Sequence, residues 1–394
     1  MMSKRIVICC DGTGNELNTT MSNVLKFYRI LEKTPEQRVL YTPGIGTLNQ
    51  DNTWQRLRQK VRSVFGVATG YGLDDDVLEA YDFLCQHWER GDRIYLLGFS
   101  RGAYTVRVVA ALVETIGILP PDQRNLAGYG LTAYKKASGD KPEPLVSAEL
   151  QTAWLFGNVA GGRPARIEFI GVWDTVASII VPRGDRLIPS LQTLRFTRTN
   201  AAVKTFRQAI SIDERRRMFR LNRWTSPQSY RPDPYDKSSE TPQDILQVWF
   251  AGVHADVGGG YPESASGLAK YPLGWMLDEA QAAGLTFHAS LRRSIADGDT
   301  SPHGKETFVA PNPGAELHRS LTGGWWILEW LPKRVRWREW PARRALWGWY
   351  LPMGEPRRLP DDALIHFSVR ERMAQVTDYR PVNLPTAPCF TDDR

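Results

Sequence analysis

The sequence has few cysteines and no long apolar run. Its 394 residues include four cysteines and no C-x-x-C pair, which excludes a disulfide framework and a zinc site. We expect all four to be buried packing residues: Cys9, Cys10, Cys85 and Cys389. No stretch of about 18 apolar residues occurs, so no transmembrane helix is expected. The apolar run at residues 6–10 is also too short for a secretion signal. We therefore expect a soluble, cytoplasmic product whose export would need another route.

Two phosphate-binding motifs are missing as well. There is no G-x-x-x-x-G-K-[ST] loop, and no G-x-G-x-x-G with an acid downstream. An Asp-Gly-Thr string at residues 11–13 follows the first apolar run, as it does in phosphatases of the haloacid dehalogenase type. Those enzymes need another aspartate two residues earlier, where this chain has Cys9. These absences exclude the phosphatase and dinucleotide-binding classes, and we expect neither a cofactor nor a metal ion.

Short apolar runs rich in β-branched residues alternate with helical patterns along the chain. The runs end in glycine or aspartate and predict strands at residues 5–10, 38–42, 93–97, 166–172, 208–212 and 245–253. Apolar residues at helical spacing predict helices at residues 23–32, 74–89 and 103–116. Because the strands are apolar throughout, we expect helices on both of their faces. The alternation predicts an α/β fold with a mainly parallel, doubly wound sheet.

Two regions depart from this pattern. Residues 120–165 are rich in proline, glycine and lysine, and we expect them to form an insertion over the edge of the sheet. Residues 325–349 hold seven of the chain's 14 tryptophans, interleaved with lysine and arginine. The sequence thus predicts an α/β core over residues 1–284 and a cap or membrane-contacting region over residues 285–394.

A G-x-S-x-G pattern lies between a predicted strand and a predicted helix. Residues 98–102 read Gly-Phe-Ser-Arg-Gly. In an α/β hydrolase the nucleophilic serine occupies a sharp turn of this kind, where two glycines prevent clashes as the backbone doubles back. The pattern and its context indicate an α/β-hydrolase core with cap or lid insertions, in which Ser100 is the candidate nucleophile.

A serine nucleophile needs a histidine to take its proton and an acid to orient that histidine. Among six histidines, His254 fits best, because it follows a late apolar run and opens a glycine-rich loop; His366 is the second choice. Asp174 and Asp213 both end predicted strands, where open α/β sheets gather catalytic groups. Asp174 is favoured, because Asp213 is followed by Glu214 and three arginines, which offer it an ion-pairing role.

The negative charge that develops on an ester oxygen needs backbone donors. The turn after the first strand can supply one of them, from Gly12 or Thr13, and the residue after the nucleophile, Arg101, supplies the other. We expect Asp11 to support the turn. Asp256, in the glycine-rich loop, either braces that loop or binds a cation.

Five strings in this order resemble the DUF2235 family, the Tle1-like phospholipase effector domain of type VI secretion. They cover residues 11–15, 98–103, 171–176, 211–216 and 249–261. The resemblance implies an α/β-hydrolase fold, phospholipase A activity and a triad of Ser100, Asp174 and His254. It also implies an immunity protein and a secretion carrier as partners, and delivery by type VI secretion. A His-x-Ser-Val string like that at residues 366–369 occurs near the end of family members, which keeps His366 as an alternative base.

Together these observations predict a serine hydrolase that cleaves carboxylic esters, most concretely a phospholipase A-type lipolytic enzyme. Two alternatives belong to other classes. One is an esterase or thioesterase that acts on a soluble substrate. The other is a catalytically idle interaction module that keeps the fold.

Residues 324–351 are a candidate membrane-contacting surface. They carry six basic residues against two acidic ones, a net charge of +4 out of the chain's +7. Tryptophans suit the membrane interface, and basic residues attract anionic headgroups. We expect a broken amphipathic cap; the alternative is a cap whose tryptophans are buried against the core. Nucleic-acid binding uses the same residue types, but no recognised module accompanies them, and no nucleic-acid partner is expected.

Overall fold

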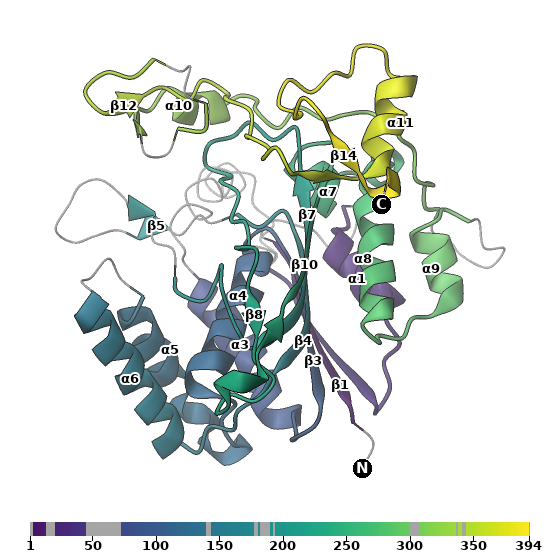
Figure 1. Ribbon diagram of the computed structural model, residues 1–394. Coiled ribbons are helices and arrows are strands. Elements are labelled where there is room, and N and C mark those ends of the chain that lie inside the picture. The colour runs from purple at the N-terminus through teal and green to yellow at the C-terminus, as the bar shows by residue number, and fades with distance from the viewer. Residues whose placement is uncertain are drawn as a thin grey trace, which may run out of the picture.

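The computed structural model describes residues 3–12, 20–44, 72–138, 143–176, 180–181, 190–191, 194–299, 307–335, 338–340 and 344–393. An eight-stranded sheet lies at the centre of the molecule (Figure 1), with the strand order β14-β13-β10-β7-β4-β3-β1-β2. Every pairing in this sheet is parallel. The predicted α/β-hydrolase-like fold, a parallel sheet flanked by helices, is therefore confirmed.

Six strands overlap the predicted ones, although β7 begins five residues earlier than predicted and β10 ends three residues earlier. They are β1 (Arg5–Cys10), β2 (Gln37–Thr42), β3 (Arg93–Phe99), β4 (Ile167–Trp173), β7 (Val203–Ser211) and β10 (Asp244–Phe250). Two further strands at one edge were not predicted, β13 (Leu364–Ile365) and β14 (Cys389–Phe390). Because each has only two residues, neither gives a periodic signal in the sequence.

The sheet is buried on both faces, as its apolar strands predict. In β1, Ile6 and Ile8 belong to one hydrophobic cluster, while Val7 and Cys9 belong to the cluster on the opposite face. This follows from the alternation of side chains along a strand. The neighbouring Cys10 joins the first cluster, so the two adjacent cysteines pack on opposite faces.

Helices cover the two faces of the sheet (Figure 1). One face carries α3 (Leu73–His87) and α4 (Arg101–Ile116). The other carries α1 (Asn23–Ile30), α8 (Lys270–Ala282) and α9 (Ala289–Ile295). Three aspartates in the first turn of α3 stabilise this helix, because their negative charge lies at the positive end of the helix dipole. The Ser22 side chain caps α1 by accepting from the Leu25 N–H. Among the described residues, no helix is both long and apolar enough to cross a bilayer.

The insertion at residues 120–165 lies elsewhere than predicted. It forms a 3₁₀ turn (Pro121–Leu126) and two helices, α5 (Ala127–Lys136) and α6 (Glu143–Val159). These helices pack on α3 and α4 and form an outer layer on that face (Figure 1), not a cover over the sheet edge. Their buried side chains, among them Leu131, Tyr134 and Ala153, join the hydrophobic cluster that α4 shares with the sheet.

The C-terminal part of the chain does more than cap the core. It contributes β13 and β14 to the sheet, so the boundary expected at residue 284 does not separate the sheet from the cap. It also places α10 (Trp325–Glu329), the hairpin β11–β12 (Lys333–Arg334, Trp349–Tyr350) and α11 (Phe367–Gln375) at the carboxyl end of the sheet (Figure 1). Two more short hairpins are β5–β6 (Ile180–Val181, Ser190–Leu191) and β8–β9 (Ser229–Tyr230, Thr241–Pro242).

Candidate active site

Ser100 occupies a strained turn between β3 and α4. Its φ and ψ are 55° and −117°, a conformation that costs a non-glycine residue about 1–3 kcal/mol and is concentrated at functional sites. Both flanking positions require glycine, because any side chain there would clash with neighbouring backbone atoms. A Cβ on Gly98 would lie 2.6 Å from the Gly102 carbonyl oxygen, and one on Gly102 would lie 2.1 Å from the Cys10 carbonyl oxygen. The turn therefore has the shape of a nucleophile elbow.

The turn that follows β1 lies beside Ser100. A Cβ added to Gly12 would come within 3.2 Å of the Ser100 Cβ. The Gly12 N–H donates to Asp11 Oδ1 (2.6 Å), and Asp11 Oδ2 accepts from the hydroxyls of Ser22 and Tyr41, the latter at 2.8 Å. Asp11 thus holds the turn, and the Gly12 N–H is already engaged. Thr13, the other predicted donor in this turn, lies outside the described residues.

Asp174 and His254 meet at the carboxyl edge of the sheet. Asp174 follows β4, and His254 begins α7 (His254–Gly258), directly after β10 and its loop. The distance from His254 Nδ1 to Asp174 Oδ2 is 2.6 Å, and both residues are buried. The structure therefore brings together the favoured acid and the favoured base, which are 80 residues apart in the sequence.

The protonation states of this pair suit a general base. Burial lowers the pKa of His254 below its ordinary value, although the hydrogen bond with Asp174 works in the opposite direction. Burial alone raises the pKa of Asp174, but the Arg357 guanidinium and His254 outweigh it and hold that pKa well below its usual range. At neutral pH the imidazole is therefore neutral and the carboxylate is ionised, as proton transfer from a serine requires.

The elbow and the imidazole are neighbours. The Phe99 ring, on the residue before Ser100, lies 4.7 Å from the His254 ring. Gly258 allows this approach, because a Cβ there would overlap the Phe99 ring at 1.8 Å. Among the described residues, no hydrogen bond joins the Ser100 hydroxyl to His254. Such bonds often tighten only when a substrate is bound.

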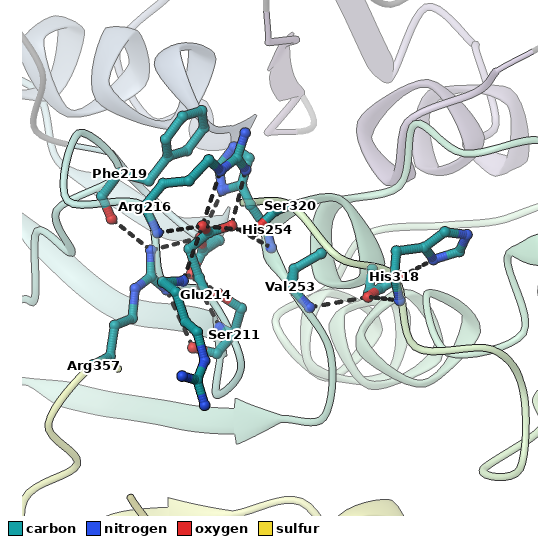
Figure 2. Close-up of polar contacts among 12 residues, drawn as sticks. Ser211, Glu214, Arg216, Phe219, Val253, His254, His318, Ser320 and Arg357 are labelled. Atoms are coloured by element: carbon teal, nitrogen blue, oxygen red, sulfur yellow. Dashed lines mark hydrogen bonds and ion pairs between the residues drawn. The ribbon is translucent and has the colours of Figure 1, made fainter. Parts of the chain in front are cut away.

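Glu214 fixes the backbone at His254. Its Oε2 accepts from the His254 N–H (3.2 Å), and its carboxylate also pairs with Arg216 and accepts from the Ser320 hydroxyl (2.9 Å), as Figure 2 shows. Burial raises the pKa of Glu214, but the contacts with Arg216 outweigh that effect and bring the pKa to about 2. The sequence suggested ion pairing among residues 213–217, but it gave no sign that Glu214 supports the histidine.

Arg357 is the second residue that sequence reasoning missed. Its guanidinium forms a two-pronged contact with Asp174, with Nη1–Oδ1 and Nη2–Oδ2 distances of 2.5 and 3.0 Å. It also donates to the Ser211 hydroxyl (2.6 Å) and to the Phe219 carbonyl (2.8 Å), and Figure 2 shows it reaching in from the C-terminal part of the chain. No local pattern in the sequence connects residues 174 and 357.

The alternative acid and base have other partners. Asp213 Oδ2 accepts from the Gly252 N–H (2.7 Å) and the Tyr379 hydroxyl (2.8 Å), and burial raises its pKa to about 6. His366 follows β13, three strands from β4, and its Nδ1 lies 2.8 Å from the Ser368 hydroxyl at the start of α11. Burial lowers the pKa of His366 to about 4. In the described part of the chain, neither residue forms a hydrogen bond or ion pair with His254 or Ser100.

Asp256 braces the start of α7. Its Oδ2 accepts from the Val253 N–H (3.0 Å), and its Oδ1 lies 2.6 Å from His318 Nδ1. The Tyr261 ring stacks on His318. Asp256 therefore has the bracing contacts that were one of its two predicted roles. Among the described residues, no group of three or more His, Cys, Asp or Glu side chains is arranged to hold a metal ion.

Aromatic rings connect His254 to the C-terminal part of the chain. The Phe219 ring lies 4.7 Å from the His254 ring, and the Trp325 ring, in α10, lies 5.3 Å from Phe219. The Arg216 guanidinium sits 3.6 Å from the centre of the Phe219 ring. The first residue of α10 is thus one ring away from the histidine.

Comparisons with known proteins show what the chain is similar to. Residues 4–279 match the family model of the catalytic domain of Tle1-like phospholipase effectors of the type VI secretion system. The chain is 33% identical over 241 residues to the uncharacterized protein YEL023C of Saccharomyces cerevisiae; the match covers 58% of this chain and 34% of the yeast protein. The chain therefore spans about a third of the length of this curated relative.

Two solved structures are also similar. One is the crystal structure of an uncharacterized protein from Pseudomonas aeruginosa, with 20% identity, a TM-score of 0.39 and coverage of 74% of this chain and 47% of that one. The other is the Tle1 effector bound to the VgrG spike of the type VI secretion system, with 19% identity, a TM-score of 0.32 and coverage of 68% and 52%.

Proposed function

This chain belongs to the family of Tle1-like catalytic domains of type VI secretion phospholipase effectors, and from that premise we propose that it is a phospholipase A-type serine hydrolase. Membership supports lipolytic hydrolysis in general. The observation that carries the finer proposal is the His254–Asp174 hydrogen bond of 2.6 Å beside the strained elbow at Ser100.

In the proposed reaction, Ser100 Oγ attacks the ester carbonyl carbon while His254 Nε2 takes its proton. Asp174 accepts from Nδ1–H, which leaves the lone pair of Nε2 for the serine and stabilises the imidazolium that forms. The tetrahedral intermediate collapses, and the imidazolium gives its proton to the leaving alcohol. Water then hydrolyses the acyl-enzyme with the same histidine as base.

The Arg101 N–H is the donor that we propose for the negative charge on the ester oxygen, because it directly follows the nucleophile. The second donor belongs to the turn after β1. Gly12 and Thr13 are the two residues of that turn from which we propose this donor, and the Gly12 N–H donates to Asp11 Oδ1 in the structure.

A surface of exposed tryptophans is the proposed membrane contact. Among the described residues of 324–351, three tryptophans are exposed, and four aliphatic side chains are exposed with them: Trp326, Trp330, Trp347, Ile327, Leu331, Leu346 and Leu351. We refer to these seven side chains as the tryptophan surface. The stretch that bears them also carries a net charge of +4, which suits anionic lipid. Their exposure favours membrane contact over the alternative in which this stretch is buried on the core.

The position of this surface supports the same proposal. Trp326 follows Trp325, which is linked to His254 through Phe219. Directly before β12 lies a two-residue turn at Trp347 and Gly348, both with positive φ, closed by two hydrogen bonds between Leu346 and Trp349. Trp347 is 91% exposed in this turn, so its ring projects away from the protein. A membrane bound there would lie close to the proposed catalytic pair.

Family membership also supports the proposal that the protein is exported by type VI secretion, with a carrier protein and an immunity protein as partners. Co-purification with a spike protein of the same system would test the first partner.

Labelling with a fluorophosphonate probe tests the proposed nucleophile, because such probes react only with an activated serine. We expect wild type to be labelled and Ser100→Ala to remain unlabelled with an unchanged fold. An unlabelled wild type would favour the idle interaction module. Labelling together with hydrolysis of a short soluble ester, and no release of fatty acid from vesicles, would favour the soluble-substrate esterase.

A further inference from the structure

The two-pronged contact between Arg357 and Asp174 suggests a role for the arginine in the candidate active site. Arg357 lies beyond the residues that match the family model, in the stretch that follows the tryptophan surface. We propose that Arg357 is a positioning residue: it fixes the Asp174 carboxylate against His254, so that the catalytic pair is complete only when the C-terminal part of the chain is docked. This inference rests on the proposed function.

The geometry of the contact fixes the carboxylate plane. A guanidinium presents parallel N–H groups that match the two oxygens of a carboxylate, and a lysine ammonium does not. Here Oδ1 receives Arg357 Nη1 and the Ser211 N–H (3.0 Å), while Oδ2 receives Arg357 Nη2 and His254 Nδ1. With both oxygens held, Oδ2 points at the imidazole.

Burial makes the contact necessary. Asp174 is fully buried and Arg357 is 4% exposed. A buried carboxylate without a charged partner becomes protonated rather than remain as an unpaired charge. A protonated Asp174 can no longer serve as the ionised acceptor for Nδ1–H, and the tautomer that leaves Nε2 free to accept the serine proton is lost.

Arg357 is itself held firmly in place. Its carbonyl accepts from Asn383 Nδ2 (2.9 Å), and the same amide donates to the Ile212 carbonyl (2.9 Å). Its Nη2 donates to the carbonyl of Phe219, the residue that packs on His254. The arginine therefore connects the C-terminal part of the chain to the end of β7 and to the aromatic wall of the candidate active site.

The surrounding charges predict the direction of a pH effect. In addition to Asp174, His254 faces the Glu214–Arg216 ion pair. Asp174 faces His254 and Arg357. In addition to Asp174, Arg357 faces Glu214 and Glu339. Loss of the guanidinium lets Asp174 take a proton at higher pH. It also leaves His254 beside an uncompensated carboxylate, so the imidazole is protonated at higher pH. Both changes shift the acid limb of the pH–rate profile to higher pH.

The test compares kcat, KM and the pH profile for a soluble ester in wild type, Arg357→Met and Arg357→Lys. For Arg357→Met we expect kcat to fall about a hundredfold with little change in KM, and the acid limb to rise by about one pH unit. Arg357→Lys keeps the charge and loses the planar contact, so we expect a lower kcat and an acid limb at the wild-type pH. Should Arg357→Met not fold, Arg357→Gln replaces it, with the same expected rise.

Arg372→Met is the matched control. Arg372 is a buried arginine of the same C-terminal region, and its Nη1 donates to the Pro313 and Ala315 carbonyls (both 2.6 Å), not to the catalytic pair. Its loss destabilises the docked region but leaves the acid limb in place. An acid limb that stays at the wild-type pH in Arg357→Met and Arg357→Gln would overturn the inference. Ester hydrolysis that persists in Ser100→Ala would instead overturn the proposed function on which it rests.

Discussion

Two groups of side chains in residues 325–357 have opposite surroundings. Glu329, Glu355 and Arg357 are charged and buried, whereas Trp330 and Trp347 are aromatic and exposed. Ordinary proteins show the reverse, because charged side chains are almost never fully buried unless they are paired. Here each has partners: Arg357 pairs with Asp174, Glu355 pairs with Arg217 (3.8 Å), and Glu329 accepts from the backbone N–H groups of Arg217 (2.7 Å) and Gly354 (3.3 Å).

The contrast separates two tasks within one stretch of chain. Arg357 attaches the stretch to the proposed catalytic Asp174, and Glu329 and Glu355 attach it to Arg217. The tryptophans make no comparable contribution to the core, and they remain available for an apolar partner, which we propose to be a lipid surface. A residue of the first group should therefore affect turnover, and one of the second group should affect binding to vesicles.

The largest expected effect concerns the buried acid. Asp174→Asn should lower kcat for a soluble ester by about 10⁴-fold, because an amide stabilises the wrong imidazole tautomer. Asp213→Asn is the matched change at the other predicted acid, which bonds to Tyr379 instead of a histidine. It should lower kcat by less than about tenfold. Steady-state kinetics on both variants would decide between the two acids, and the opposite ranking would exclude Asp174.

The next effect concerns stability at low pH. The pKa of Glu214 is about 2 in the folded protein, below its ordinary value of 4.5. An acid whose pKa is lowered on folding stabilises the protein above the unfolded-state pKa, and that stability is lost as the pH falls towards the folded-state value. The contribution of the Glu214 carboxylate to the free energy of unfolding, about 3 kcal/mol at neutral pH, should decline below pH 4.5.

Urea unfolding at a series of pH values measures this effect. Wild type should be more stable than Glu214→Gln at pH 7, and the difference between the two should shrink progressively as the pH falls from 4.5 to 3. A difference that is constant over this range would mean that the Glu214 carboxylate is not specifically stabilised in its ionised form.

The smallest effect concerns the exposed tryptophans. Trp347→Gly should weaken binding to vesicles that contain anionic lipid by about tenfold or more, since a buried aromatic side chain contributes about 1.5–3 kcal/mol. Glycine accepts the φ of 48° at this position without strain, so the turn should keep its shape. Hydrolysis of a soluble ester should be unchanged.

Trp154→Ser is the control for that change. Trp154 is also exposed, but it lies on α6, away from the tryptophan surface. Flotation with vesicles should show wild-type binding for this variant. Equal binding by wild type, Trp154→Ser and Trp347→Gly would mean that the turn at Trp347 does not contact lipid.

The sequence predicted those parts of the molecule whose pattern is local. Apolar runs predicted six strands because each is long enough to show that it is buried on both faces. The G-x-S-x-G pattern predicted a strained turn because only glycine fits where β3 and α4 meet. Ser100, Asp174 and His254 could be selected as candidates because each directly follows a predicted strand.

Long-range contacts could not be predicted in this way. Arg357 and Asp174 are 183 residues apart, and no pattern in the sequence around either residue indicates that the two are in contact. The strands β13 and β14 have two residues each and form only because β10 offers an edge. The two helices of the insertion were placed over the sheet edge, because composition indicates an insertion without indicating which surface it covers.

Release of fatty acid from mixed phospholipid vesicles, with wild type and Ser100→Ala side by side, tests the central claim most directly. We expect release by wild type and none above background by Ser100→Ala, whose circular dichroism should match that of wild type. Equal release by both proteins would contradict the proposal that Ser100 is the nucleophile of a phospholipase.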